Sequence, residues 1–149
     1  MKKNKTCSFF GHRDVSTESY PALYSEIERH ITEYGVTTFY VGKHGNFDWL
    51  STSVLNELKP KYPHIEIILV FAYSPSNKLS DYSANRCDSA IYPEKLKTIP
   101  QNLALYYRNC WVVQQSDFVI SYVRIRFGYA YNAIIYALRK KKHVTNFLS

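Results

Sequence analysis

The stretch that decides the fold is Thr-Cys-Ser-Phe-Phe-Gly-His-Arg, residues 6–13, where a short apolar run stops at a glycine followed by two nitrogen-bearing side chains. A run of this length that ends in glycine indicates a buried strand leading into a loop. In open parallel sheets, the loops at the carboxyl ends of the strands form the ligand crevice, at the point where the strand order reverses. We therefore expect a ligand-facing loop at Gly11, His12 and Arg13.

Apolar runs of this kind alternate along the chain with segments of helical spacing. We expect strands at 6–10, 36–41, 65–71, 118–123 and 143–147, and helices at 20–34, 47–58, 101–115 and 128–141. Because crossovers between parallel strands are nearly always right-handed, this series predicts one α/β domain over residues 1–149. The expected architecture is a Rossmann-like three-layer sandwich with a five-stranded, mostly parallel sheet in the order 3-2-1-4-5.

This order places the first and fourth strands side by side. The Gly11 loop then faces the loop at residues 124–128, and the loop at 42–48 opens beside them. Residues 73–100 show no lasting period and contain three prolines, so we interpret them as a long loop or insertion.

Composition and charge narrow the class of protein. The chain has 149 residues, 46% of them hydrophobic, and no apolar stretch approaches the roughly 20 residues that span a bilayer. The start, Met-Lys-Lys-Asn-Lys, does not resemble a signal peptide, so we expect a cytoplasmic protein. Three cysteines without Cys-x-x-Cys spacing indicate neither a disulfide framework nor a zinc knuckle.

The net charge of +7 is concentrated near the C-terminus, where residues 118–149 contain six Arg or Lys and no Asp or Glu. Such an imbalance favours anionic partners, either a small nucleotide or a nucleic acid. The run at residues 139–142 has a second explanation, because cations at the end of a helix complement its dipole.

The sequence resembles the SLOG superfamily, the Rossmann-like proteins named for the DNA-processing Smf/DprA proteins and the LOG phosphoribohydrolases, and within it the YpsA/YoqJ-like branch. The resemblance covers almost the whole chain. It depends on four features in order: Phe10-Gly11-His12-Arg13, the Gly-x-x-Gly-x-Phe-Asp form at residues 42–48, Arg108-Asn109 followed by Ser116-Asp117, and Gly128 at the start of the last helix.

The resemblance implies a pocket for a nucleotide or nucleotide-derived ligand at the strand ends. The expected ligand-binding residues are Gly11, His12, Arg13, Gly42, Lys43, Gly45, Asn46, Asp48, Arg124, Arg126 and Gly128. Glycines let backbone N–H groups approach phosphate, and Arg13, with Arg124 or Arg126, is placed to clamp it. Asp48 either accepts hydrogen bonds from ribose hydroxyls or caps its helix.

One departure bears on activity. The family's hydrolases carry a Pro-Gly-Gly-x-Gly-Thr-x-x-Glu motif after the fourth strand, whereas residues 124–132 here hold one glycine and no carboxylate. Because hydrolysis of an N-glycosidic bond needs a carboxylate beside the sugar, we expect a binding domain rather than an enzyme. Asp48, Asp14 and Glu18 are the carboxylates that other loops offer as substitutes.

Three functions therefore stay open: a nucleotide-binding domain, a phosphoribohydrolase acting on nucleoside monophosphates, and a single-stranded nucleic-acid binder in the DprA manner. The third is supported by 14 Tyr and 8 Phe, although many fall at core positions. His12 is a candidate acid or base or a structural residue. His44 and Asp48 lack the spacing of a closed metal site, and we expect no metal or cofactor. Related domains pair through helices, which makes a homo-oligomer possible.

Two further expectations concern packing. Arg108 and Asn109 lie on the helix that leads to the start of the fourth strand, so we expect them far from the crevice, where they tie helix to sheet with Asp117 as a candidate partner. Trp49 and Trp111 are expected in the core or at a dimer interface.

Overall fold

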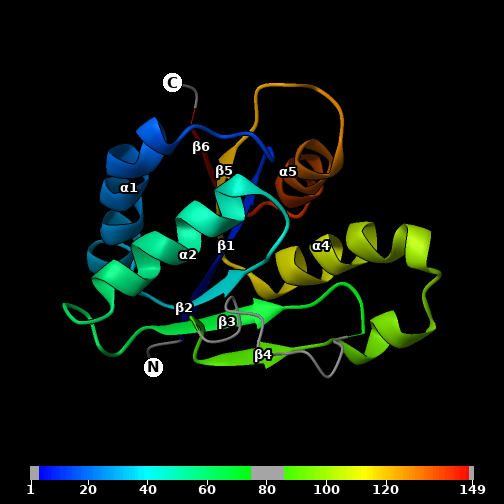
Figure 1. Cartoon of the computed structure of the whole chain (residues 1–149), viewed down its shortest axis with the longest axis horizontal. Coiled ribbons are helices and arrows are strands. Elements are labelled where there is room, and N and C mark those ends of the chain that lie inside the picture. The colour runs from blue at the N-terminus through cyan, green and yellow to red at the C-terminus, as the bar shows by residue number, and fades with distance from the viewer. Residues whose placement is uncertain (1–3, 75–85, 148–149) are drawn as a thin grey trace.

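The computed structural model describes residues 4–74 and 86–147. Within these residues a six-stranded sheet has the order β4-β3-β2-β1-β5-β6, and every adjacent pair is parallel (Figure 1). The strands are β1 (Lys5–Gly11), β2 (Val36–Val41), β3 (Glu66–Val70), β4 (Ser89–Ile91), β5 (Phe118–Tyr122) and β6 (His143–Asn146). The α-helices are α1 (Tyr20–Thr32), α2 (Asn46–Leu58), α4 (Ala104–Gln115) and α5 (Tyr129–Arg139), and the 3-10 helices are η1 (Thr17–Ser19), η2 (Glu94–Thr98) and η3 (Gln101–Leu103).

Strand β1 is the centre of the sheet. It pairs with β2 on one side and with β5 on the other, where Gly11 is opposite Tyr122. From β1 the chain adds β2, β3 and β4 on one side, and α4 then carries it back to β5 on the other side. The strand order therefore reverses beside the Gly11 turn. In parallel sheets this is the place where ligands bind.

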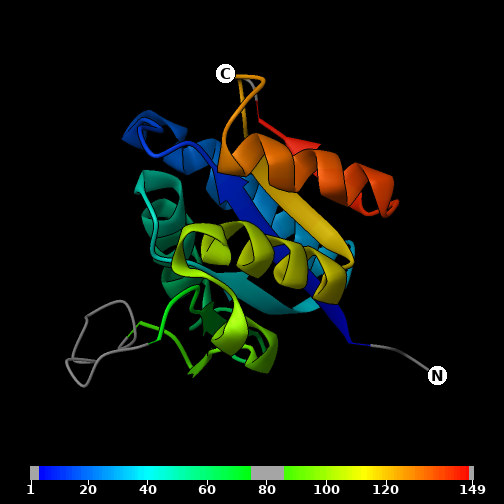
Figure 2. The same cartoon turned by 90° about the vertical axis from the view of Figure 1, so that its right-hand side faces the viewer.

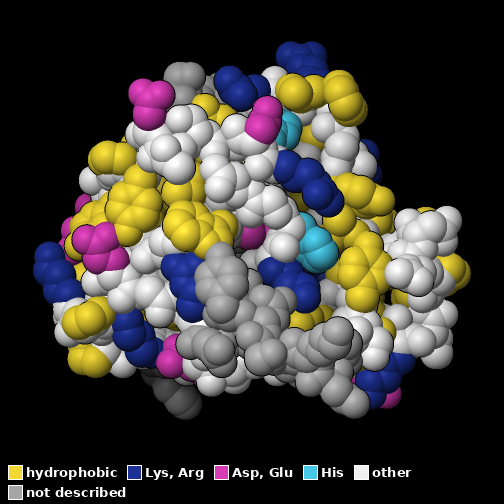
Figure 3. Space-filling view, in the orientation of Figure 1, with side chains coloured by type: hydrophobic (Ala, Val, Ile, Leu, Met, Phe, Trp, Pro, Cys, Tyr) yellow, Lys and Arg dark blue, Asp and Glu magenta, His cyan; other side chains and the backbone are white. Residues whose placement is uncertain are grey.

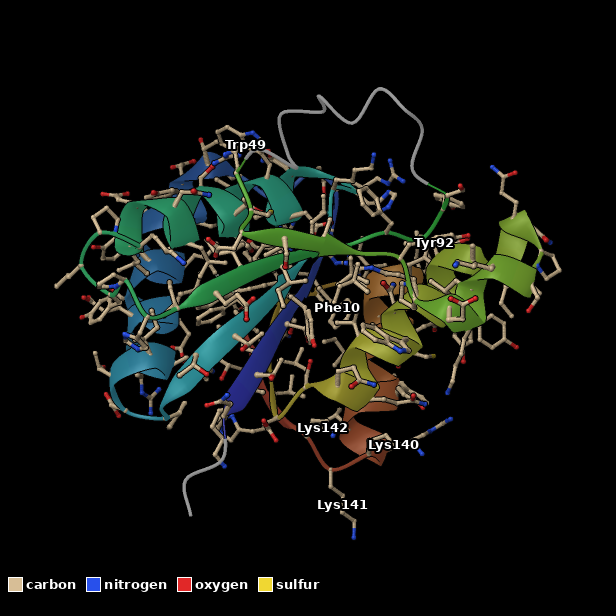
Figure 4. The ribbon with its side chains drawn as sticks, turned by 90° about the horizontal axis from the view of Figure 1, so that it is seen from below. Phe10, Trp49, Tyr92, Lys140, Lys141 and Lys142 are labelled. Carbon is tan, nitrogen blue, oxygen red and sulfur yellow. The ribbon has the colours of Figure 1, made fainter. Side chains whose placement is uncertain are left out.

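Helices cover both faces of the sheet. In Figure 2, α4 and α5 lie in front of the strands, and residues of α1 and α2 pack in the core on the opposite face. Successive strand residues point to opposite faces, and β1 uses this alternation to serve both layers. Phe9 packs into the core with Leu23 and Leu50 from α1 and α2. Phe10 packs into the core beneath α4 and α5, and Figure 4 shows it on the α4 side. The α/β three-layer prediction is therefore confirmed.

The prediction of five strands is wrong. The five expected strands keep their expected neighbours, but β4 adds an edge strand beside β3, inside the region interpreted as a loop. The three residues of β4 are too few to show the alternation of apolar and polar side chains that indicates a strand in a sequence. Asp88, just before β4, holds the edge: its backbone N–H donates to the Ile67 carbonyl at 2.8 Å, and its carboxylate accepts from the Ile67 N–H at 2.7 Å. The rest of the expected loop includes residues 75–85, which lie outside the described residues.

The cationic run at the end of α5 lies at the amino-terminal edge of the sheet. Figure 4 labels Lys140, Lys141 and Lys142 there, beyond the last turn of the helix. Lys141 has a left-handed φ of 59°, and its N–H donates to the Leu138 carbonyl at 3.0 Å, so it ends the helix. Among the described residues, no helix is long and apolar enough to cross a membrane.

A buried histidine on α1 makes the fold sensitive to pH. His30 is fully buried, its Nδ1 lies 2.8 Å from the Glu26 carbonyl oxygen, and its ring meets Tyr34 and Phe118 edge-on at 4.9 and 5.5 Å. Its Nε2 has no hydrogen-bond partner within the described residues. Burial lowers the pKa of His30, since the opposing pull of the Glu26 carbonyl and carboxylate is smaller than the desolvation.

We predict that this histidine destabilises the fold in acid. Because the pKa of His30 is lower in the folded state, the unfolded chain binds the proton first, and the free energy of unfolding falls as pH drops below the unfolded value of about 6.5. Urea unfolding at pH 7.5 and 5.5 should show a smaller drop for His30→Phe than for the parent chain. An equal drop in both proteins would contradict the prediction.

Candidate ligand-binding pocket

A pocket of about 260 Å³ opens at the carboxyl edge of the sheet, between the ends of β1 and β5. We call it the main pocket. Its lining comes from four segments: the end of β1 with the turn after it, the loop before α2 with the first turn of that helix, the first two turns of α4, and the loop before α5 with the start of that helix. The lining residues are Phe9, Phe10, Gly11, His12, Arg13, His44, Asp48, Leu105, Arg108, Asn109, Ile125, Phe127, Gly128, Tyr129 and Ala130.

The turn after β1 is shaped by close packing against α2. A Cβ added to Gly11 would lie 2.4 Å from the Phe47 ring, so only glycine fits there. Two residues later, the Arg13 carbonyl accepts the Asn46 N–H at 2.9 Å. This bond and the Asn46 side-chain amide, which donates to the Val15 carbonyl, fasten the turn to the first residue of α2.

His12 joins this turn to the loop after β5. Its Nε2 accepts the Arg124 N–H at 2.8 Å and the Ile125 N–H at 3.3 Å, while its own backbone N–H donates to the Tyr122 carbonyl at 3.2 Å. In this arrangement one ring nitrogen serves as the acceptor for two backbone N–H groups of the facing loop. Of the two roles expected for His12, this geometry supports the structural one.

The loop between β2 and α2 brings an acid and a histidine to the main pocket. The Asp48 carboxylate accepts the His44 backbone N–H at 2.8 Å. Burial raises the pKa of Asp48, and the nearby Arg108 and Arg13 only partly offset it. Burial, assisted by repulsion from Arg108, Arg13 and Lys43, lowers the pKa of His44 to about 4. At neutral pH the main pocket therefore contains an uncharged His44, and its cations are arginines.

Arg108 lines the main pocket, although the sequence analysis placed it far from the crevice. Helix α4 begins at the carboxyl edge, and its second turn puts Arg108 in the wall of the main pocket, 4% exposed. The guanidinium donates to the Val70 carbonyl through Nε and to the Val41 carbonyl through Nη2, each at 3.1 Å, and to Asn109 Oδ1 at 2.9 Å. Arg108 thus joins the ends of β2 and β3.

Asp117 does not pair with Arg108 as expected. Its carboxylate accepts the Thr6 N–H at 3.0 Å at the opposite edge of the sheet, where β1 begins. The signal for Arg108 was present in the sequence, because the residue falls on the stripe that Leu105 and Val112 direct inward. A cation on a buried stripe requires buried acceptors, and the unpaired carbonyls at strand ends supply them.

Gly42 explains how Arg108 and Asp48 share the site. A Cβ added to Gly42 would lie 2.8 Å from Arg108 Nη2 and equally close to Asp48 Oδ2. The Arg108 guanidinium and the Asp48 carboxylate therefore both occupy space that a side chain at position 42 would need. Gly42 shapes the main pocket without lining it.

The other expected residues divide into two groups. Gly45 and Asn46, with Arg13, Asp14 and Trp49, line a shallow neighbouring depression, which we call the side hollow. Lys43, Arg124 and Arg126 line neither cavity. The Lys43 ammonium lies 5.4 Å from the centre of the Phe71 ring, and the Arg124 guanidinium 5.4 Å from that of Tyr122. Of the three arginines expected to clamp phosphate, Arg13 alone borders the main pocket.

The loop into α5 is exposed and carries apolar side chains between its arginines. Phe127 is 73% exposed and Tyr129 is 50% exposed, so these rings border the main pocket without filling it. In Figure 3, histidine and basic side chains surround an acidic side chain near the middle of the face shown. In residues 4–74 and 86–147 no group of three His, Cys, Asp or Glu is placed to hold a metal.

Of the two tryptophans expected in the core or at a dimer interface, Trp111 packs against the core beneath α4 and α5. Trp49 is 44% exposed on the outer side of α2, as Figure 4 shows. Trp111 is half-buried, with its ring 5.9 Å from that of Tyr40. The described cysteines are all unpaired, and Cys7 is buried.

Solved structures with the same fold include two DNA processing proteins A. DprA from Streptococcus pneumoniae aligns with a TM-score of 0.70 at 14% identity, over 98% of this chain and 51% of that chain. DprA from Helicobacter pylori, whose single-stranded DNA binding mode is described, aligns with a TM-score of 0.67 at 14% identity, over 97% of this chain and 66% of that chain. The chain spans about half to two thirds of their length. It matches no protein-family model and no curated protein.

We predict that Arg108→Lys destabilises the protein by about 1.5 to 3 kcal/mol, the range for hydrogen bonds that involve a charged group. Lysine cannot reach the Val41 and Val70 carbonyls together with the planar fork of arginine. The matched control is Arg139→Lys at the exposed end of α5, which should change the free energy of unfolding by less than about 0.5 kcal/mol. Urea unfolding measures both, and equal effects would contradict the structural role of Arg108.

Proposed function

We propose that the chain binds a nucleotide or nucleotide-derived ligand in the main pocket. The observation that carries the proposal is the convergence of the turns after β1, β2 and β5 on one cavity, at the reversal of strand order. A volume of about 260 Å³ lies just below the roughly 300–1,000 Å³ found for small-molecule sites. This size suits one nucleoside monophosphate.

The start of α5 supplies the phosphate site in this proposal. Gly128 precedes the helix with a φ of 100°, which favours glycine, and no side chain caps the helix there. An added Cβ at Gly128 would meet nothing within 4 Å, so the space beside this glycine is open. The first N–H groups of a helix lack partners within the helix and attract anions.

The charges around the main pocket support a phosphate at the same end of the ligand. Arg108 is committed to strand carbonyls and His44 is neutral, so the exposed Arg13 is the pocket cation available for phosphate. Asp48 is placed to accept hydrogen bonds from sugar hydroxyls. Phe127 and Tyr129 offer exposed ring faces to a base. We also propose that the chain belongs to the YpsA/YoqJ-like branch of the SLOG superfamily and that the protein is cytoplasmic.

We predict that Arg13→Ala weakens binding of adenosine monophosphate by about 1.5 to 3 kcal/mol, since it removes a charge-assisted hydrogen bond to phosphate. Isothermal titration calorimetry measures the change. Arg139→Ala, at the far end of α5, removes the same charge away from the pocket and should leave the affinity within about twofold. Unchanged affinity in Arg13→Ala would remove Arg13 from the site.

Incubation of the protein with adenosine monophosphate also distinguishes a binding domain from a hydrolase. Asp48 is the carboxylate that lines the main pocket, while Asp14 borders the side hollow and Glu18 borders neither. A phosphoribohydrolase would release free base from the monophosphate, which chromatography detects. Release that is lost in Asp48→Asn would establish the enzyme, and intact nucleotide after prolonged incubation supports a binding domain.

A second candidate, binding of single-stranded nucleic acid, is favoured by the loop between β5 and α5. Cations at Arg124 and Arg126 alternate there with the exposed Ile125 and Phe127. Exposed rings beside cations suit single strands, whose bases stack while their phosphates pair with arginine. The fold shared with a DprA whose single-stranded DNA binding mode is described adds to this candidate.

For this candidate we predict that Phe127→Ala weakens binding of a short single-stranded oligonucleotide by about 1 to 3 kcal/mol, the usual loss for one stacking ring. Leu138→Ala removes an exposed apolar side chain at the other end of α5 and should have little effect. Affinity should also fall steeply with salt, with a slope of about 0.7 per phosphate contacted. Fluorescence anisotropy at three salt concentrations tests both, and a flat salt response would exclude this function.

A further inference from the structure

Arg13 borders both cavities at the carboxyl edge of the sheet. It lines the main pocket together with Asp48 and Gly128, and it lines the side hollow together with Asn46 and Trp49. The two cavities are therefore neighbours that share one cationic residue. The main pocket has room for about one nucleotide, so a larger ligand would have to extend beyond it, and the side hollow lies on the other side of Arg13.

The position of Arg13 is fixed by its backbone. The Asn46 N–H donates to its carbonyl at 2.9 Å, and a Cβ added to Gly45 would lie 2.8 Å from the Arg13 Cα. Gly45 itself has a φ of 104°, a conformation that favours glycine. This tight contact holds the arginine against the first turn of α2, between the two cavities.

The first turn of α2 serves both cavities with adjacent residues. Asp48 lines the main pocket and Trp49 lines the side hollow, because successive helix residues point about 100° apart. The Trp49 N–H also donates to the Gly45 carbonyl at 3.3 Å, within the same turn. The floor of the two cavities is thus one rigid element.

Trp49 is oriented as well as exposed. The Arg86 guanidinium lies 5.2 Å from the centre of its ring, and Arg86 Nη2 donates to Ser53 Oγ at 2.6 Å on the next turn of α2. An indole that is 44% exposed and held in this way is a stacking surface for a base. The acid in the side hollow, Asp14, disfavours a second phosphate there and is able to accept hydrogen bonds from sugar or base.

We propose that the ligand contains two nucleosides joined through phosphate, with one nucleoside in the main pocket, the phosphate linkage at Arg13, and the second base on Trp49. The inference rests on the proposed nucleotide-binding function and specifies the ligand. Two sources share this chemistry: a free dinucleotide joined by pyrophosphate, and two successive units of a nucleic-acid strand.

Calorimetric titrations with three ligands test the proposal: adenosine monophosphate, diadenosine 5′,5′-diphosphate and the 3′,5′-linked dinucleotide ApA. At least one dinucleotide should bind about 10-fold tighter than the monophosphate, the gain expected of one stacked base. The dinucleotide that binds tighter identifies the source. Trp49→Ala should remove this gain and leave the monophosphate affinity within about twofold, whereas Trp49→Phe, which keeps a ring, should retain most of it.

Tyr107→Ala is the matched control, since Tyr107 on α4 is also 44% exposed but lines neither cavity. It should leave all affinities unchanged. If the monophosphate binds and neither dinucleotide binds tighter, or if the gain survives Trp49→Ala, the two-nucleoside ligand is wrong while the main-pocket function stands. If no nucleotide binds the parent chain, the proposed function fails and this inference fails with it.

Discussion

The buried guanidinium of Arg108 is the interaction on which the candidate site depends. Strands β2 and β3 end with carbonyl groups that point toward the pocket, and Arg108 satisfies one from each strand. It also faces Asp48 across Gly42. A buried cation needs such partners, and the carboxyl ends of parallel strands provide them. The arginine therefore joins two strand ends in the wall of the main pocket and lies close to its acid.

The overall architecture could be predicted because it depends on patterns that sequence shows directly. The apolar run ending at Gly11, the helical spacing before Gly35 and the break at Gly42 are local signals, and the right-handed crossover rule converts them into a sheet order. The edge strand β4 could not be predicted in this way. Its three residues carry no period, and Asp88 positions it through contacts with Ile67 that are distant in sequence.

The site was predicted in part for the same reason. Residues at the end of a strand or in the segment that follows it, such as Gly11, Arg13 and Asp48, were assigned to the edge by topology, and they line the main pocket. Arg108 was missed because the sequence analysis considered only where α4 ends, at the start of β5. Arg108 lies in the second turn of the helix, near the carboxyl edge of the sheet. Arg124 and Arg126 follow β5 as expected, yet neither lines a cavity, because the direction of a side chain in a loop is not fixed by periodicity.

The imidazole of His12 links two loops through one ring nitrogen that accepts from Arg124 and Ile125. Two backbone N–H groups of the loop after β5 thus depend on one side chain from the β1 turn. A residue at position 12 without this acceptor would leave both groups without their partner and would free one wall of the main pocket from the opposite turn, although the strands beneath would stay paired.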